Sequence, residues 1–374
     1  MLSAVKKRLI LFTLTLFSIP YVWGEELCAG LQYRKLTSER QQTIHVLDVD
    51  PKRLKIVAAH AKEQAFGRET VASIAKRYKA IAAINGGFFK GGETTDGLPA
   101  GILKIRSHWY GVAYRSRGAI GWSDPMRTVL IDRIQTKTSI YLNHHKVPLH
   151  TVNQPGLANK AVLYTDAYGQ TAGSMTGGYD ITIDNNRITA IQPAGKTTIP
   201  KDGFVYSLGP QARYPRFPID IGNSAMVNIE VVPHFGKENY LAWQMVENII
   251  GGAPLLIFNS KPIKDYSSER MPSAFIRERY ARSAVGTLEN GHWIFVVVEQ
   301  SALTGSPGMT IPELTDLMQQ LGCEYALNLD GGSSSTLYLD NAVINQLVGD
   351  DEEDYSWATL RPVSDAILLL PKRK

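Results

Sequence analysis

The segment 327–338, LNLDGGSSSTLY, places one acid, two glycines and three serines directly after an apolar run. Glycines at the end of a strand let the backbone turn with its N–H groups open to a ligand. Such N–H groups, with hydroxyls beside them, suit phosphate or sugar oxygens. A carboxylate fixed there can attack carbon, act as a base or bind hydroxyls. The segment therefore predicts a binding and catalytic turn formed by Asp330, Gly331, Gly332, Ser333 and Ser334, rather than a plain turn or a linker.

A second segment, INGGFF, repeats the order of apolar run, polar residue and two glycines. Asn85 ends the run, and Gly86 and Gly87 leave space around the backbone. Phe88 and Phe89 offer flat apolar faces on which a sugar ring can stack, although core packing is the alternative for at least one of them. The segment therefore predicts a second candidate ligand-binding turn.

Several familiar chemistries are excluded by the absence of their motifs. The sequence has no HExxH, no GxxxxGK[ST] and no GxGxxG after a strand. GGSSS is not the GxSxG of a nucleophile elbow, because Ser335 stands where the last glycine is needed. No histidine and cysteine cluster has the spacing of a structural zinc site. The serines are therefore predicted to bind substrate rather than to attack it.

Similar elements lead into both glycine pairs. Apolar residues recur at i, i+3, i+4 and i+7 within 69–79, which predicts a helix before the apolar strand 81–84. Thr310 and Glu313 form a capping box, and Gly322 ends the helix that precedes YALNL. The order of helix, strand, polar residue and Gly-Gly thus occurs twice. We interpret this as two equivalent positions in one core.

The remaining segments are mostly β-like. Residues 44–59 predict two strands around a turn at Asp50 and Pro51, and 101–233 holds short apolar runs separated by Gly, Pro and Asn. HWIFVVVE is almost continuously apolar and is predicted to be a central strand. Residues 366–370 predict a last strand. The predicted fold class is α+β, with a mixed, largely antiparallel sheet core and a few packed helices.

The first 24 residues have the pattern of a secretory signal: three basic residues, an apolar run from Leu9 to Ile19, and a cut expected after Gly24. Export to the periplasm or the medium follows, with no stable membrane anchor. Without this segment the formal charge of +5 falls by three to +2, which leaves no support for nucleic-acid binding. Cys28 and Cys323 could pair in an exported protein, but the sequence does not show whether they do. The acidic run 350–354 is expected to be a solvated loop.

Together these motifs resemble the phosphodiester glycosidase family, which includes the mannose 6-phosphate uncovering enzyme and bacterial members described as exopolysaccharide-biosynthesis-like. AINGGFF, GGAPLLI, ARSAVG, the NLDGGSSSTLY region and RPVSDAILL occur in the family's order across 44–370. The resemblance implies an uncovering-enzyme-like catalytic domain over 44–371, after a signal peptide (1–24) and an N-terminal segment (25–43). Its pattern carries onto Asn85, Gly86, Gly87, Phe88, Gly251, Gly252, Arg282, Asn328, Asp330, Gly331, Gly332 and Ser334, and onto Arg361 and Pro362.

Three positions depart from the family pattern. Ala281 replaces a proline, Glu299 replaces an aspartate at the end of the central strand, and Gln300 and Ser301 replace a Gly-Arg pair. The departures at Glu299 and at Gln300 and Ser301 bear on which substrate the protein accepts and on whether it is active.

The resemblance implies hydrolysis of a sugar from a sugar-1-phosphodiester. A phosphate monoester leaves without a strong proton donor, unlike the alcohol of an ordinary glycoside. Arg282 suits a bidentate contact with that phosphate. Asp330 is the first choice for the carboxylate on the sugar side and Glu299 the second, and Asn85 and Asn328 are expected to bind sugar hydroxyls or to orient the acid.

Two alternatives remain open. The first is an exported carbohydrate-binding or exopolysaccharide and envelope-assembly protein that does not catalyse hydrolysis. The second is a phosphodiesterase acting at phosphorus with a metal. No cofactor is firmly implied, a divalent cation is possible, and the expected partner is a carbohydrate or a glycan phosphate. The sugar, the stereochemical course and the oligomeric state are not determined by the sequence.

Overall fold

The computed structural model describes residues 25–124, 128–346 and 360–372. The expected signal sequence and the acidic run 350–354 lie outside these residues. Most strands pair antiparallel, and the described α-helices are short: α1 (Val71–Tyr78), α2 (Tyr240–Met245), α3 (Ser273–Arg277) and α4 (Ile311–Gln320). The prediction of a largely antiparallel, sheet-rich core with few helices is confirmed, and the α+β class stays a prediction.

An eight-stranded sheet, here called the β20 sheet, contains one of the two glycine motifs at the end of β24. All of its strands pair antiparallel. Its order is β1 (Glu25–Cys28), β2 (Leu31–Thr37), β3 (Thr43–Val49), β21 (Trp293–Val298), β20 (Arg282–Leu288), β24 (Cys323–Asn328), β18 (Leu255–Phe258) and β19 (Lys261–Pro262). The apolar run HWIFVVVE forms β21, which lies inside the sheet between β3 and β20 as predicted.

A five-stranded sheet, the β5 sheet, contains the other glycine motif. Its order is β26 (Ala342–Val343), β25 (Leu337–Leu339), β5 (Ala82–Asn85), β27 (Asp365–Pro371) and β4 (Leu54–His60). The two strands predicted around Asp50 and Pro51 exist as β3 and β4, but they join different sheets. The turn between them therefore connects two layers.

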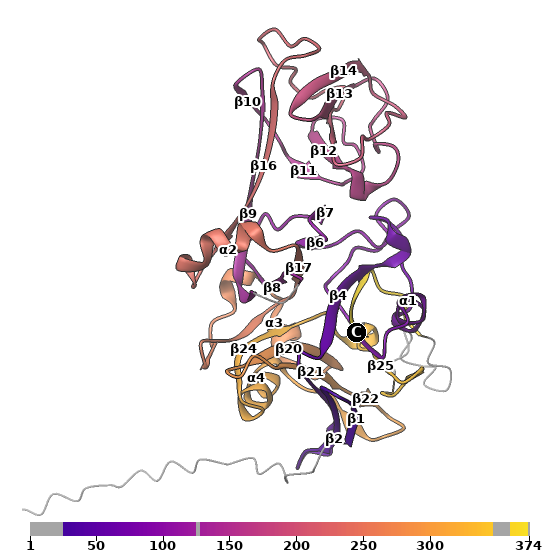
Figure 1. Ribbon diagram of the computed structural model, residues 1–374, viewed down its shortest axis with the longest axis vertical. Helices are drawn as coiled ribbons and strands as arrows, with labels where there is room; N and C mark the ends of the chain where they lie inside the picture. The colour runs from indigo at the N-terminus through magenta and orange to yellow at the C-terminus, as the bar shows by residue number, and fades with distance from the viewer. Residues whose placement is uncertain (1–24, 125–127, 347–359, 373–374) are drawn as a thin grey trace, which may run out of the picture.

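The middle of the chain forms the other two large sheets (Figure 1). The β8 sheet has the order β10 (His145–Val147), β9 (Val129–Leu142), β8 (Arg117–Trp122), β17 (Asn248–Gly251), β6 (Leu103–Ile105) and β7 (His108–Gly111), with β16 (Ala225–Pro233) against β9. The outer sheet has the order β11 (Thr151–Val152), β12 (Ala161–Thr165), β15 (Phe204–Leu208), β13 (Tyr179–Asp184) and β14 (Arg187–Pro193). In Figure 1 the outer sheet lies at one end of the molecule, beside the long strands β9 and β16.

The core is continuous between three of these sheets. Trp122 of the β8 sheet packs edge to face on Trp293 of the β20 sheet, with ring centroids 5.5 Å apart. The Trp122 indole N–H donates to the carbonyl oxygen of Ile56, in the β5 sheet, at 3.1 Å. Buried aromatic pairs contribute to stability beyond their buried area. Through its ring contact and its hydrogen bond, Trp122 therefore holds together the two sheets that carry the glycine motifs.

The helix before the motif of Asp330, α4, begins at the predicted capping box, whereas the cap of α1 was not predicted. The Thr70 hydroxyl caps α1, and the capping box of Thr310 and Glu313 begins α4. No described helix has the length and apolar character needed to cross a membrane. The cysteines do not pair: Cys28 is half-buried on β1, and Cys323 is buried on β24.

Candidate active site

The two glycine motifs meet where β5 and β24 end. The backbone N–H of Asp330 donates to the carbonyl oxygen of Gly86 at 3.1 Å, and Asn85 Nδ2 donates to the carbonyl oxygen of Asp330 at 2.8 Å. These bonds join the β5 sheet to the β20 sheet. The two positions that the sequence suggested to be equivalent therefore face each other across one junction.

The side chain of Asn85 links the segments that meet at this junction. Its side chain is fully buried, and Oδ1 accepts from the Ser283 hydroxyl at 2.7 Å and from the Thr336 N–H at 3.2 Å. Every polar atom of the amide therefore binds protein. This geometry suits the expected role of orienting the acid, whereas the expected contact of Asn85 with sugar hydroxyls stays a prediction.

Asp330 lies half-buried at the junction. Its Oδ1 accepts from the Gly331 N–H at 2.9 Å. Burial raises the pKa of Asp330 to about 6, although the Ser334 hydroxyl, the Gly331 N–H and the charge of Arg361 act to lower it. Arg361 Nη1 donates to the Ser333 hydroxyl. The structure thus gathers the predicted residues Ser333, Ser334 and Arg361 around the predicted acid.

A second carboxyl group, which the sequence did not single out, belongs to Asp365 at the start of β27. It is buried and accepts from the Gly87 N–H at 2.9 Å and from the Ser364 hydroxyl. Burial, together with the negative charge of Asp330, raises the pKa of Asp365 to about 6. A Cβ added to Gly86 would stand 1.9 Å from Asp365 Oδ1, so only glycine fits there. The available signal was an acid at the head of a strand that is otherwise apolar.

A cavity of about 250 Å³ opens beside Asp365. Of the predicted site residues, Gly87, Phe88, Gly251 and Gly252 line it, whereas Asp330 and Arg361 do not. Both rings of the INGGFF motif, Phe88 and Phe89, are half-exposed on its wall, so neither is purely a core residue.

Arg117 lines the same cavity and was missed by the sequence reasoning. It begins β8, and its Nη1 lies 2.8 Å from the sulfur of Met271. Nothing near Arg117 in the sequence marks it, because only the fold brings β8 to the glycine motifs.

Asn328 lies next to Gly252, one of the residues that line this cavity. Its Nδ2 donates to the carbonyl oxygens of Ala253 at 2.6 Å and Leu329 at 2.7 Å. A Cβ on Gly252 would lie 2.3 Å from the Asn328 carbonyl oxygen, so the glycine permits the close approach of these two segments. Asn328 Oδ1 is buried without a hydrogen-bond partner among the described residues.

The family model of the phosphodiester glycosidases matches residues 177–370, more than half of the chain. The chain belongs to the phosphodiester glycosidase family. The matched region contains Asp330, Asp365 and Arg361, whereas Asn85 and Arg117 precede it.

Individual relatives of this chain are distant. An uncharacterised protein of Rickettsia conorii is 25% identical over 261 residues, which cover 69% of this chain and 87% of the relative. A solved hypothetical protein from Synechocystis superposes with a TM-score of 0.76 at 25% identity; the match covers 94% of this chain but only 64% of the Synechocystis chain. A solved protein from Burkholderia pseudomallei superposes with a TM-score of 0.70 at 21% identity, over 88% of this chain and 74% of the other, and shows the shared fold.

Arg282, the predicted phosphate ligand, is fully buried. Its Nε donates to the Met309 carbonyl oxygen at 2.8 Å, and Nη2 donates to those of Phe275 and Glu278. Burial lowers the pKa of Arg282 to about 10. Nη1 is buried with no hydrogen-bond partner in the described part of the chain, and Arg282 does not line the cavity beside Asp365. Its contact with phosphate stays a prediction.

Glu299, the second-choice acid, lies in a different buried network. Its carboxylate accepts from His45 Nε2 at 2.8 Å, from the Gln346 N–H at 2.9 Å and from the Thr304 hydroxyl at 3.1 Å. Burial acts to raise its pKa, but these hydrogen bonds, that of His45 foremost, lower it overall. A carboxylate with all of these donors is held as an acceptor, and Glu299 does not line the cavity beside Asp365. A catalytic role for Glu299 stays a prediction without geometric support.

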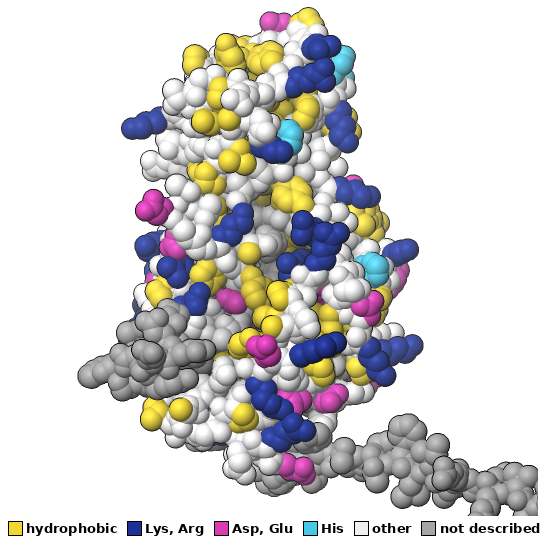
Figure 2. All heavy atoms as spheres, turned by 180° about the vertical axis from the view of Figure 1, so that it is seen from behind, with side chains coloured by type: hydrophobic (Ala, Val, Ile, Leu, Met, Phe, Trp, Pro, Cys, Tyr) yellow, Lys and Arg dark blue, Asp and Glu magenta, His cyan; other side chains and the backbone are white. Residues whose placement is uncertain are grey.

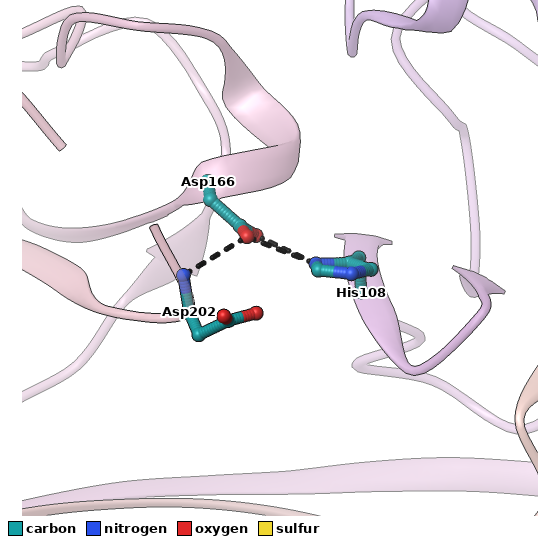
Figure 3. A group of neighbouring side chains, drawn as sticks. All are labelled: His108, Asp166 and Asp202. Carbon is teal, nitrogen blue, oxygen red and sulfur yellow. Dashed lines mark hydrogen bonds and ion pairs between the residues drawn. The ribbon is translucent and has the colours of Figure 1, made fainter. Parts of the chain in front are cut away.

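Within the described residues, one group has the spacing of metal ligands: His108, Asp166 and Asp202 (Figure 3). Their ligand atoms all lie within 4.8 Å of one another, and His108 Nδ1 lies 2.9 Å from Asp166 Oδ2. The group lies between β7 and the outer sheet, and none of its residues lines the cavity beside Asp365. The possible divalent cation therefore has a candidate site at this boundary rather than at Asp330.

Proposed function

We propose that this phosphodiester glycosidase is an exported hydrolase that releases a sugar from a sugar-1-phosphodiester. The observation that carries the proposal is the junction of the two glycine motifs. It holds two interacting carboxyl groups of raised pKa, Asp330 and Asp365, next to a cavity lined by aromatic rings and an arginine. Such perturbed acids mark functional sites. Export rests on the sequence of residues 1–24.

Asp330 acts on the sugar side. As a carboxylate it attacks the anomeric carbon or takes a proton from the attacking water. The bond from the anomeric carbon to the phosphate oxygen breaks, and the electron pair leaves with the phosphate monoester. Water supplies the new hydroxyl group on the sugar. Because the leaving group is a weak base, no second carboxylic acid has to protonate it.

The cations of the site fit the phosphate. Arg117 lines the cavity, and its Nη1 contacts the thioether sulfur of Met271. Arg361 lies beside Asp330 and Ser333. A guanidinium binds phosphate oxygens with two parallel N–H groups, which stabilises the charge that develops as the bond breaks. Asp365 is a positioning residue: it fixes the Gly86–Gly87 turn.

The test identifies the bond that breaks. The protein is incubated with a panel of sugar-1-phosphodiesters in ¹⁸O-labelled water, and the products are examined by mass spectrometry. We expect the label in the sugar and none in the phosphate, and we expect Asp330→Asn to lose the reaction while it stays folded. Label in the phosphate would replace the proposal by phosphodiesterase action at phosphorus.

Metal-dependent phosphodiesterase action is favoured by one observation, the group of His108, Asp166 and Asp202. Under our proposal a chelator leaves the rate unchanged, and so does His108→Ala. Loss of activity under both treatments would support this alternative.

A binding protein without catalysis is favoured by the departures at Glu299, Gln300 and Ser301 from the family pattern. This alternative predicts that sugar-1-phosphodiesters bind but that no member of the panel is cleaved. Turnover of any member that depends on Asp330 excludes it.

A further inference from the structure

The cavity beside Asp365 continues into a longer groove. A second cavity, of about 360 Å³, shares Pro99, Ala100, Gly101 and Arg117 with the first. A third, of about 430 Å³, shares Lys90, His150, Thr151 and Gln154 with the second. We call the three together the groove. Its walls come from the β5 and β8 sheets at one end and from the outer sheet at the other.

The charged side chains of the outer two cavities all have the same sign. The second cavity is lined by Lys90, Arg115 and Arg117, and the third by Lys90 and Lys160. His150 lines both, whereas no Asp or Glu is among the described residues that line either one. Figure 2 shows Lys and Arg side chains gathered around the middle of one face, where the surface is hollowed.

The protein neutralises these cations little: a carboxylate that acts on Arg117, that of Glu269, is itself ion-paired with Arg133. None of Lys90, Arg115, Arg117 and Lys160 takes part in an ion pair within the described residues. Lys90 Nζ donates to the neutral amide oxygen of Gln154 at 2.6 Å, and the contact of Arg117 Nη1 is the sulfur of Met271. Like charges gathered in a hollow without counter-charges attract an anionic ligand and raise its local concentration.

The position of the cations indicates the shape of that anion. Arg117 lines both the first and the second cavity, so the series of cations begins at the candidate active site and runs away from it. A single sugar phosphodiester carries one negative charge and needs only the first cavity. A chain with a phosphate at every repeat would meet further cations along the groove.

We propose that the groove binds an extended glycan whose repeats are joined by phosphodiesters, so that the enzyme cleaves a polyanionic polymer rather than a small sugar phosphate. This inference rests on the proposed function of the same site. His150 adds a polar contact: Nδ1 accepts from the Ala161 N–H at 3.0 Å, so in the neutral ring the proton lies on Nε2.

The experiment measures affinity against chain length. The probes are synthetic oligomers of one, two, four and six hexose-1-phosphate units, and the protein carries Asp330→Asn so that it binds without turnover. We expect the dissociation constant to fall about tenfold from one unit to four, and this gain to shrink as salt is raised, because the contacts are exposed charge pairs. A dissociation constant that does not change with length would overturn the proposal.

Two double variants in this background locate the effect. Arg115→Ala with Lys160→Ala removes two cations of the groove, and we expect the gain with length to disappear. Arg216→Ala with Lys261→Ala removes the same charge from exposed positions that do not line the groove, and the gain should remain. If both pairs behave alike, the attraction comes from overall charge and the groove is not the binding site.

Two further measurements test the class of ligand and distinguish failure of the groove proposal from failure of the proposed function. Single-stranded DNA of equal charge should bind more weakly than the hexose-phosphate oligomer; equal affinity would contradict a glycan site. If the wild-type protein cleaves the one-unit probe but shows no gain with length, the groove proposal fails while the function stands. If length matters but nothing is cleaved, the proposed function fails and the groove stands.

Discussion

Asp330 and Asp365 interact, and both remain protonated to a higher pH than ordinary aspartates. The proposed chemistry needs Asp330 as a carboxylate, and burial raises its pKa to about 6. We therefore expect kcat/KM on a sugar-1-phosphodiester to rise about tenfold per pH unit below pH 6 and to level off above it. Steady-state kinetics from about pH 4 to pH 8 tests this.

The control for that profile is Asp365→Asn, which removes a negative charge that interacts with Asp330. The midpoint should stay near pH 6, because burial raises the pKa of Asp330, whereas the charge of Asp330 acts on Asp365. Asp330→Asn should lower the rate by about 10² to 10⁴ at every pH. A wild-type rate that falls as pH rises through 6 would assign the role of acid, rather than base or nucleophile, to the titrating group.

Asp365 also makes stability depend on pH. Its pKa is 3.8 ordinarily and about 6 in the folded protein, so between these values the folded state holds a proton that the unfolded state releases. This contribution to stability is present below about pH 4 and is lost as pH rises through 6. Relative to wild type, Asp365→Asn should gain up to about 3 kcal/mol between pH 4 and pH 8. Urea unfolding of both proteins at the two pH values measures the difference, and a constant difference would contradict the assignment.

Sequence reasoning found the site residues that local patterns mark and missed those that the fold supplies. Asp330 stands out because glycines and serines surround it, and Asn85 because it repeats the same order. Asp365 and Arg117 lie at the starts of β27 and β8, where one charged residue before an apolar strand is ordinary. Arg282 was predicted because it lies in a motif of the family, and Glu299 because it replaces an aspartate of the family pattern. The histidine partner of Glu299 comes from a distant segment, and the carbonyl partners of Arg282 belong to the segment just before it and to Met309. No local pattern reveals these contacts.

At the scale of elements, the predicted strands and the helices α1 and α4 are confirmed. The sequence did not predict which strands pair with one another. The periodicity of a segment fixes its type, since it reports which faces are buried. It does not report that β3 and β4 enter different sheets, or that β27, the last strand, lies between β5 and β4. Such pairings decide where β5 and β24 end, and hence the site.

The junction of these elements depends on glycines with no room for a side chain. Gly86→Ala would place Cβ 1.9 Å from Asp365 Oδ1, so β5 and β27 would have to separate. We expect a loss of about 2–4 kcal/mol in unfolding free energy, and activity reduced at least tenfold in whatever remains folded. Gly91→Ala, in the same loop with nothing within 4 Å of the new Cβ, is the matched control and should change both quantities little. Equal effects of the two substitutions would show that the close approach is not what the junction requires.

The whole molecule consists of sheets joined by a shared apolar core and by buried polar contacts, and the groove runs along one of the boundaries between sheets. Asn153, fully buried after β11, donates from Nδ2 to the Trp109 carbonyl oxygen at 2.6 Å and to the Thr165 hydroxyl at 2.9 Å. Its Oδ1 accepts from the Thr165 N–H at 2.9 Å. The half-buried pair of His108 and Asp166 spans the same boundary.

We expect the buried amide, and not the half-buried contact of His108 with Asp166, to hold the outer sheet on the β8 sheet. Asn153→Ala leaves buried groups unpaired and places alanine at a φ of 49°, so it should cost about 2–4 kcal/mol of unfolding free energy. His108→Ala should cost less than about 1 kcal/mol, because solvent screens a partly exposed pair. Urea unfolding measures both costs, and proteolysis should cut the Asn153 variant first in the outer sheet. If the His108 variant is the less stable of the two, the boundary depends on that charged group, and a cation bound by His108, Asp166 and Asp202 becomes the better explanation of how the groove keeps its shape.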